Sequence, residues 1–134
     1  MNFIKKTRGF RNNNPGNIKK GSKWIGLSFL QSDKHFCKFQ SIEYGIRAIF
    51  KILETYRRKH GINTMASMIY RWAPPSENNT VSYINIVKKR TNINPDELLS
   101  IIEYPKIVEA IIFMENGFQP FSLEFISSCK YLED

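Results

Sequence analysis

The chain has 134 residues, of which 42% are hydrophobic and 13% aromatic, enough apolar material for one compact domain over residues 1–134. Its formal net charge of +8 favours polyanionic partners, namely nucleic acid, acidic membrane surfaces or anionic cell-wall polymers, without choosing among them. An uninterrupted apolar run of about 20 residues is absent, which excludes a transmembrane helix, and the basic N-terminus lacks the apolar core of a signal peptide.

The first 40 residues predict a polar, loop-rich segment with one small β element. Asn, Pro and Gly are concentrated between Asn12 and Gly16, a composition that specifies tight turns. Two short apolar stretches, Trp24–Leu27 and His35–Phe39, predict the strands of a small hairpin near the N-terminus.

Residues 41–134 predict a series of helices. Ser41 suits an N-cap and Glu43 suits the first turn of a helix that runs to about Lys59. Further helices are expected over residues 64–71, from residue 80 onward, and over 105–117 and 122–132, with a short one that opens at residues 94–97. The predicted fold class is therefore mainly α (α+β).

Cysteines and histidines are too few and too scattered to predict a metal site. Cys37 and Cys129 lack metal-ligand spacing, and two free buried thiols are favoured over one disulfide. His35 and His60 are isolated, so a zinc site would be hard to assemble. We expect neither a metal nor a cofactor.

The helix expected over residues 105–117 carries the most informative carboxylate. Pro105 suits its first turn, Gly117 suits its end, and the residues between them are mostly apolar. Glu115 lies in the last turn, where desolvation and the negative end of the helix dipole would both raise its pKa. A carboxylic acid that stays protonated near neutral pH is what cleavage of a glycosidic bond requires. The plain alternative is a solvent-facing side chain without a function.

Three polar clusters, over residues 11–17, 71–83 and 115–120, combine amide or carboxylate side chains with turn residues. Amides can hydrogen-bond sugar hydroxyl and N-acetyl groups, and a flat Trp offers an apolar face to a pyranose ring. The candidate sugar-binding residues are Asn14, Asn17, Trp24, Trp72, Asn78, Tyr83 and Asn116. Each has an alternative without a function. The first cluster can be an ordinary Asn-Pro-Gly turn, the second can be the end of a helix with a rigid loop, and Trp24 and Trp72 can be core residues.

The stretch over residues 14–56 resembles the part of bacterial glucosaminidases that follows their catalytic helix. The matching features are an Asn-rich turn (residues 14–18), a Trp-x-Gly strand (residues 24–26) and a Ser-capped helix after a Phe strand (residues 39–49). Trp72 and Ala73 with Tyr83 are similar to a Tyr-Ala…Tyr segment of those enzymes.

In that family the catalytic Glu precedes the Asn turn, on a helix that ends Glu-Ser-Gly. Here residues 110–120 resemble that helix, and also the Glu-Ser-Gly-Phe-x-Pro motif of lytic transglycosylases and goose-type lysozymes. The simplest account is a circularly permuted lysozyme-like domain, which is tolerated when chain termini lie close together. The pattern over residues 7–120 also resembles a group of phage and prophage proteins often described as virion or structural proteins.

These resemblances imply a peptidoglycan-cleaving glycosidase of phage or prophage origin, with Glu115 as the general acid. Glu77 is the best second carboxylate, and its separation from Glu115 would decide between retaining and inverting chemistry. Without a second carboxylate, a lytic transglycosylase route with one Glu is preferred. Tyr83 and Asn78 would orient the sugar, and Asn14 with Asn17 would bind N-acetyl groups.

Two other functions remain open. A non-catalytic virion structural or glycan-binding module would keep the same shape, and its binding would survive removal of Glu115. Nucleic-acid binding is less favoured, because basic runs such as Lys88–Arg90 are usually solvated helix ends. The expected partners are peptidoglycan strands and other virion proteins, without stable insertion into a membrane. The protein is expected in the virion or delivered to the periplasm or cell wall.

Overall fold

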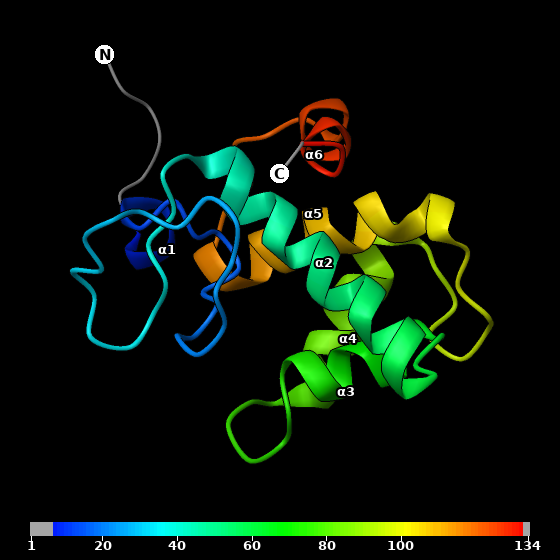
Figure 1. Cartoon of the computed structure of the whole chain (residues 1–134). Coiled ribbons are helices and arrows are strands. Elements are labelled where there is room, and N and C mark those ends of the chain that lie inside the picture. Colours follow the sequence, from blue (N-terminus) through cyan, green and yellow to red (C-terminus); the bar gives the residue numbers. More distant parts are fainter. Residues whose placement is uncertain (1–6, 133–134) are drawn as a thin grey trace.

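The computed structural model describes residues 7–132, which form six α-helices and one short 3-10 helix (Figure 1). In chain order these are α1 (Arg8–Arg11), α2 (Ile42–His60), α3 (Met65–Trp72), α4 (Thr80–Thr91), η1 (Ile101–Glu103), α5 (Tyr104–Asn116) and α6 (Leu123–Cys129). The predicted mainly α class is confirmed. None of the helices in this part of the chain is both long and apolar enough to cross a membrane.

The N-terminal β element differs from the predicted hairpin. Within residues 7–132 the backbone forms isolated bridges and no strand, and one of these bridges joins Leu27 to Phe39. These two residues face each other as expected, but the side chain of Gln31 bonds to the backbone of Ser28 and Lys38 beside them. Backbone bonds join the two stretches at few points, from the N–H of Ser28 to the carbonyl oxygen of Lys38 (2.9 Å) and from the N–H of Gln40 to that of Gly26 (2.8 Å), so no continuous strand ladder forms.

Three helical segments also differ from the sequence prediction. The sequence does not predict α1, because four residues capped by the Thr7 hydroxyl give no periodic pattern. Residues 94–97 form a turn instead of a helix, since the side chain of Asn94 accepts from the N–H of Asp96 (3.0 Å). Helix α6 ends at Cys129, three residues earlier than expected.

Helix α5 lies at the centre of the molecule and contacts α1, α2, α4 and α6 (Figure 1). Pro105 occupies its first turn and Gly117, with φ of 82°, follows its end, as the sequence predicts. Ile107 and Ile111 are among the side chains that it buries completely. Each such burial contributes about 1.5–3 kcal/mol of hydrophobic stabilisation. The carboxylate in its last turn is therefore attached to a helix that four others hold in place.

The Asn-rich turn before residue 18 lies against the start of α2. Gly45, in the first turn of α2, makes this approach possible, because a Cβ there would clash with the carbonyl oxygen of Asn13. The side-chain amide of Asn13 donates to the carbonyl oxygen of Phe39 (3.1 Å), just before the helix begins. These contacts fix the turn relative to the core.

Helix α1 closes the fold against the end of α5. The ring of Phe10 packs edge-on against Phe118 and Phe121, with centroids 5.1 and 5.8 Å apart. The hydroxyl of Thr7 donates to the side-chain oxygen of Asn116 (2.7 Å). The first described residues therefore lie beside the C-terminal end of α5, although 109 positions separate the two partners in the chain.

Both cysteines are buried and unpaired, as the sequence favours. Burial raises the pKa of the Cys37 thiol and raises that of Cys129 to about 11. A thiol whose pKa is raised carries little of the nucleophilic thiolate at neutral pH. The two side chains therefore serve as parts of the core.

Candidate functional site

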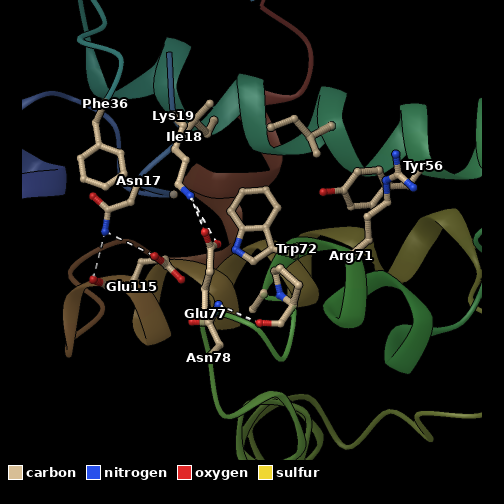
Figure 2. A pocket seen from close by; sticks show the side chains of 14 residues that line it. Asn17, Ile18, Lys19, Phe36, Tyr56, Arg71, Trp72, Glu77, Asn78 and Glu115 are labelled. Carbon is tan, nitrogen blue, oxygen red and sulfur yellow. Dashed lines mark hydrogen bonds and ion pairs between the residues drawn. The ribbon is translucent and has the colours of Figure 1, made fainter. Parts of the chain in front are cut away.

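A cavity of about 630 Å³ opens between the Asn-rich turn, one face of α2, the loop after α3 and the end of α5 (Figure 2). Its wall consists of Gly16, Asn17, Ile18, Lys19, Phe36, Ile52, Tyr56, Arg71, Trp72, Ala73, Pro74, Glu77, Asn78 and Glu115. Five of the residues that the sequence singles out thus meet here: Asn17, Trp72, Glu77, Asn78 and Glu115.

Glu115 is half-buried on the wall of this cavity, where two side chains hold its carboxyl group. The hydroxyl of Tyr83 donates to Oε2 (3.0 Å), and the amide of Asn17 donates to Oε1 (3.3 Å). Burial raises the pKa of Glu115, and hydrogen bonds from Tyr83, Asn17 and Trp72 oppose this rise without cancelling it. The group is therefore a carboxylic acid that releases its proton less readily than a free glutamic acid.

Tyr83 acts at this site through Glu115. Its side chain is buried, and burial together with the nearby negative charge of Glu115 raises its pKa far above the usual value. The phenol therefore stays protonated and donates its hydrogen to the carboxyl group at any neutral pH. Tyr83 itself does not line the cavity.

Asn14 builds the turn that carries Asn17. It is completely buried, and its amide donates to the carbonyl oxygens of Ile18 and Cys37, both at 2.9 Å. Its side-chain oxygen accepts from the N–H of Ile18 (3.0 Å). The turn that results holds Asn17 in a left-handed conformation, with φ of 50°, on the cavity wall. The structure thus places Asn14 behind the cavity wall and Asn17 within it.

Trp72 is the last residue of α3, and its ring lies near the middle of the cavity wall (Figure 2). The chain then turns at Pro74, which cannot continue the helix, and the following loop brings Glu77 and Asn78 to the rim. An indole beside amide side chains offers an apolar face and hydrogen-bonding groups in one place.

Glu77 crosses the cavity mouth to reach the opposite wall. Its two carboxylate oxygens lie 3.1 and 3.3 Å from the ammonium group of Lys19 (Figure 2). More than half of each side chain is exposed, and a pair of this kind contributes about 0–1 kcal/mol. The pair can therefore open at little cost in free energy. While it is closed, the carboxylate of Glu77 is bound to Lys19 and cannot act on a substrate.

Two other predicted residues lie outside the cavity wall. The amide of Asn116 donates to the carbonyl oxygens of Pro15 (2.8 Å) and Ile112 (2.9 Å), so it joins the Asn-rich turn to α5. Trp24 packs half-buried against the core, and within residues 7–132 its buried indole N–H has no hydrogen-bond partner. Neither residue lines the cavity, and of the two only Asn116 is bonded to the turn that carries Asn17.

Two cations of the site, Lys19 and Arg71, are not among the sugar-binding residues that the sequence predicts, although Arg71 lies in one of the polar clusters. The guanidinium of Arg71 lies 5.4 Å from the centre of the Tyr56 ring, and its Nη2 lies 3.3 Å from Nε2 of His60. Basic residues beside a helix end or a turn give no signal that separates them from an ordinary solvated surface. In the described part of the chain no group of three His, Cys, Asp or Glu side chains could hold a metal ion.

No model of a protein family matches this chain. A curated protein is similar to most of it: "Protein P5" of Pseudoalteromonas phage PM2 is 43% identical over 123 residues. The matching region covers 89% of this chain and 77% of that protein. The predicted resemblance to a group of phage proteins is thereby confirmed. The chain therefore belongs to the family of protein P5 of Pseudoalteromonas phage PM2.

Proposed function

We propose that the protein is a peptidoglycan-cleaving glycosidase of phage or prophage origin, in which Glu115 is the general acid. The observation that carries this proposal is the carboxyl group of Glu115 on a cavity wall, with its pKa raised by burial. A raised pKa extends to higher pH the range over which the group is protonated and can donate a proton to the leaving glycosidic oxygen. Its partners Tyr83 and Asn17 hold it in one orientation.

The shape and polarity of the cavity suit a glycan strand of the cell wall. Trp72 offers an apolar face to a sugar ring, and the amides of Asn17 and Asn78 can bond its N-acetyl and hydroxyl groups. Arg71 adds positive charge to the wall, which suits a polymer whose peptide stems carry carboxylates. The bond proposed for cleavage is the β-1,4 link between N-acetylmuramic acid and N-acetylglucosamine.

The ion pair between Glu77 and Lys19 favours the single-carboxylate route over one with two carboxylates. A glycosidase with two carboxylates needs the second one free to attack the sugar or to activate water. While Glu77 is bound to Lys19, the substrate's own groups must complete the reaction, as in a lytic transglycosylase. Opening of this exposed pair would make Glu77 available as the second group.

The contact between α1 and the end of α5 supports a circularly permuted lysozyme-like arrangement. In the glucosaminidases that this chain resembles, the catalytic helix precedes the Asn-rich turn in the sequence. Here the Thr7 hydroxyl bonds to Asn116, and Asn116 bonds to Pro15 within that turn. The two segments are neighbours in space although they stand at opposite ends of the sequence. Membership of a phage protein family supports a place in the virion or delivery to the periplasm or cell wall.

A non-catalytic glycan-binding virion module is the second candidate function. It is favoured by the ion pair of Glu77 with Lys19, because this pair occupies one of the two carboxylates on the cavity wall. Glu115 is then the remaining carboxyl group, and in the described residues it is bonded to neutral side chains. Such a module would use Trp72 and the amides for recognition and would need no proton transfer.

Digestion of purified peptidoglycan by the wild type and by Glu115→Gln, with mass spectrometry of the soluble products, tests the proposal. We expect muropeptides from the wild type and a loss of at least about a hundredfold in rate for Glu115→Gln, because the acid is removed while its shape is kept. Glu109→Gln is the matched control, since Glu109 lies on the same helix and pairs with Arg90 (2.7 Å). Intact wall binding without products from either protein would favour the binding module.

A further inference from the structure

The loop between Lys20 and Phe36 presents two adjacent apolar side chains to solvent. Phe29 is 98% exposed and Leu30 is 70% exposed. Single exposed apolar residues are ordinary on a protein surface, but two large neighbours that both point outward form a contiguous apolar tip. Figure 1 shows this loop, in light blue and cyan, projecting from one end of the molecule.

Hydrogen bonds on both sides hold this tip outward. The side-chain amide of Gln31 donates to the carbonyl oxygens of Ser28 and Lys38, both at 2.8 Å, and its oxygen accepts from the N–H of Lys38 (2.9 Å). The N–H of Ser28 donates in turn to the carbonyl oxygen of Lys38 (2.9 Å). The exposure of Phe29 and Leu30 is therefore built into the backbone of the loop.

The segment that carries the tip is rich in positive charge. The loop and its base carry Lys20, Lys23, Lys34 and Lys38. The ammonium group of Lys20 lies 3.4 Å from the carbonyl oxygen of Gln31, directly beside the tip. The one acidic residue of this segment, Asp33, is paired with Arg8 (2.8 Å). Within residues 7–132 none of the four lysines has a carboxylate partner.

We infer that the Phe29–Leu30 tip inserts into the surface of an anionic lipid bilayer, while the surrounding lysines contact the lipid headgroups. Apolar side chains gain free energy at the boundary between headgroups and acyl chains, and lysines are attracted to a negatively charged leaflet. An exposed apolar tip in a lysine-rich loop fits a soft anionic surface, whereas a protein partner would need a matching apolar pocket.

This inference goes beyond the proposed glycosidase and does not depend on it. Lys19 and Phe36, at the base of the loop, also line the cavity (Figure 2). A bilayer bound at the tip would therefore set the orientation of the cavity relative to the membrane.

Flotation with lipid vesicles tests the inference with the full chain. We expect the wild type to float with vesicles of phosphatidylglycerol and phosphatidylcholine in equal parts, and to stay behind with phosphatidylcholine alone. The double substitution Phe29→Ser with Leu30→Ser should weaken binding to the anionic vesicles by roughly tenfold or more.

The matched control is Leu98→Ser with Ile102→Ser. These two side chains are 79% and 86% exposed. They belong to the segment before α5, which is yellow in Figure 1 and lies at the opposite end of the molecule from the loop. This variant should bind anionic vesicles as well as the wild type does. In a separate variant, Phe29→Trp, the added indole should shift its fluorescence to shorter wavelength when anionic vesicles are added.

Three results would overturn the inference. The wild type could fail to float with the anionic vesicles, or the tip variant could float as well as the wild type. Alternatively, the tip substitutions could abolish self-association of the protein without any vesicle binding, which would assign the tip to a contact between copies of this chain.

Discussion

Two opposing influences act on the carboxyl group of Glu115. Burial at the end of α5 disfavours its charged form, while hydrogen bonds from Tyr83 and Asn17 favour it. Burial is the larger influence, and the pKa is raised. A general acid works best when its pKa lies near the operating pH, so this balance sets the upper pH limit of the proposed reaction.

Tyr83→Phe should move that limit to higher pH. The hydroxyl of Tyr83 donates to Glu115 and so stabilises the carboxylate, which means that its removal raises the pKa of Glu115 further. Because the reaction needs the protonated acid, kcat/KM should begin to fall at a higher pH in the variant than in the wild type. The measurement is the pH profile of peptidoglycan digestion by both proteins.

Tyr70→Phe provides the control for this profile, because Tyr70 lies exposed on α3 and outside the cavity wall. Its profile should match that of the wild type. A high-pH limb that falls at an ordinary glutamic acid pKa of 4.5, or that is unmoved by Tyr83→Phe, would contradict the role given to Glu115.

At the scale of the elements, the packing of the Asn-rich turn against α2 requires a residue without a side chain at position 45. Gly45 lies so close to the carbonyl oxygen of Asn13 that a Cβ could be accommodated only by moving the backbone of the turn. The same turn carries Asn17 on the cavity wall, so the fit between these two elements also positions the site.

Gly45→Ala should therefore lower the free energy of unfolding by about 1–3 kcal/mol, the usual cost of overpacking. Alanine favours a helix over glycine by about 1 kcal/mol, so a net loss would mean that the clash outweighs propensity. Chemical denaturation measures the change, and Lys59→Ala, at an exposed position of the same helix, should stay within about 0.5 kcal/mol of the wild type. A more stable Gly45→Ala protein would refute the close contact.

The elements also show how far sequence reasoning reaches. Helix α5 could be predicted because Pro105, an apolar interior and Gly117 are all local signals. The reduction of the expected hairpin to isolated bridges could not, because it depends on how the side chain of Gln31 bonds to the backbone of Lys38 beside the few backbone bonds that form. The amide of Asn14 has the right chemistry for a sugar, but the fold uses it inside the turn. Residue type is visible in the sequence, whereas the direction of a side chain is decided by the packing around it.

At the scale of the whole molecule, the excess of 20 basic over 12 acidic side chains gives a field that reaches beyond any single contact. Long-range attraction of this kind brings the protein to an anionic surface before specific bonds form. It is weakened by salt, since the Debye length is about 10 Å at 0.1 M and about 3 Å at 1 M.

Binding of the Glu115→Gln protein to purified cell-wall sacculi should therefore weaken as ionic strength rises from roughly 0.05 to roughly 0.5 M. Co-sedimentation measures the bound fraction without the complication of digestion. Arg71→Gln in the same background should bind more weakly at low salt, because Arg71 contributes charge on the cavity wall. Binding that is indifferent to salt would show that charge does not recruit this protein to the wall.

The two unpaired thiols have a consequence for where the fold can exist. Because Cys37 and Cys129 are each enclosed in the core and form no cross-link, no oxidation step is needed to reach this structure. A reducing environment cannot destabilise the fold through this pair, because the two cysteines form no disulfide bond. In an oxidising environment the two thiols are buried and therefore poorly accessible to oxidants. The same fold can thus be completed during synthesis in a reducing cytoplasm and persist unchanged in an oxidising compartment.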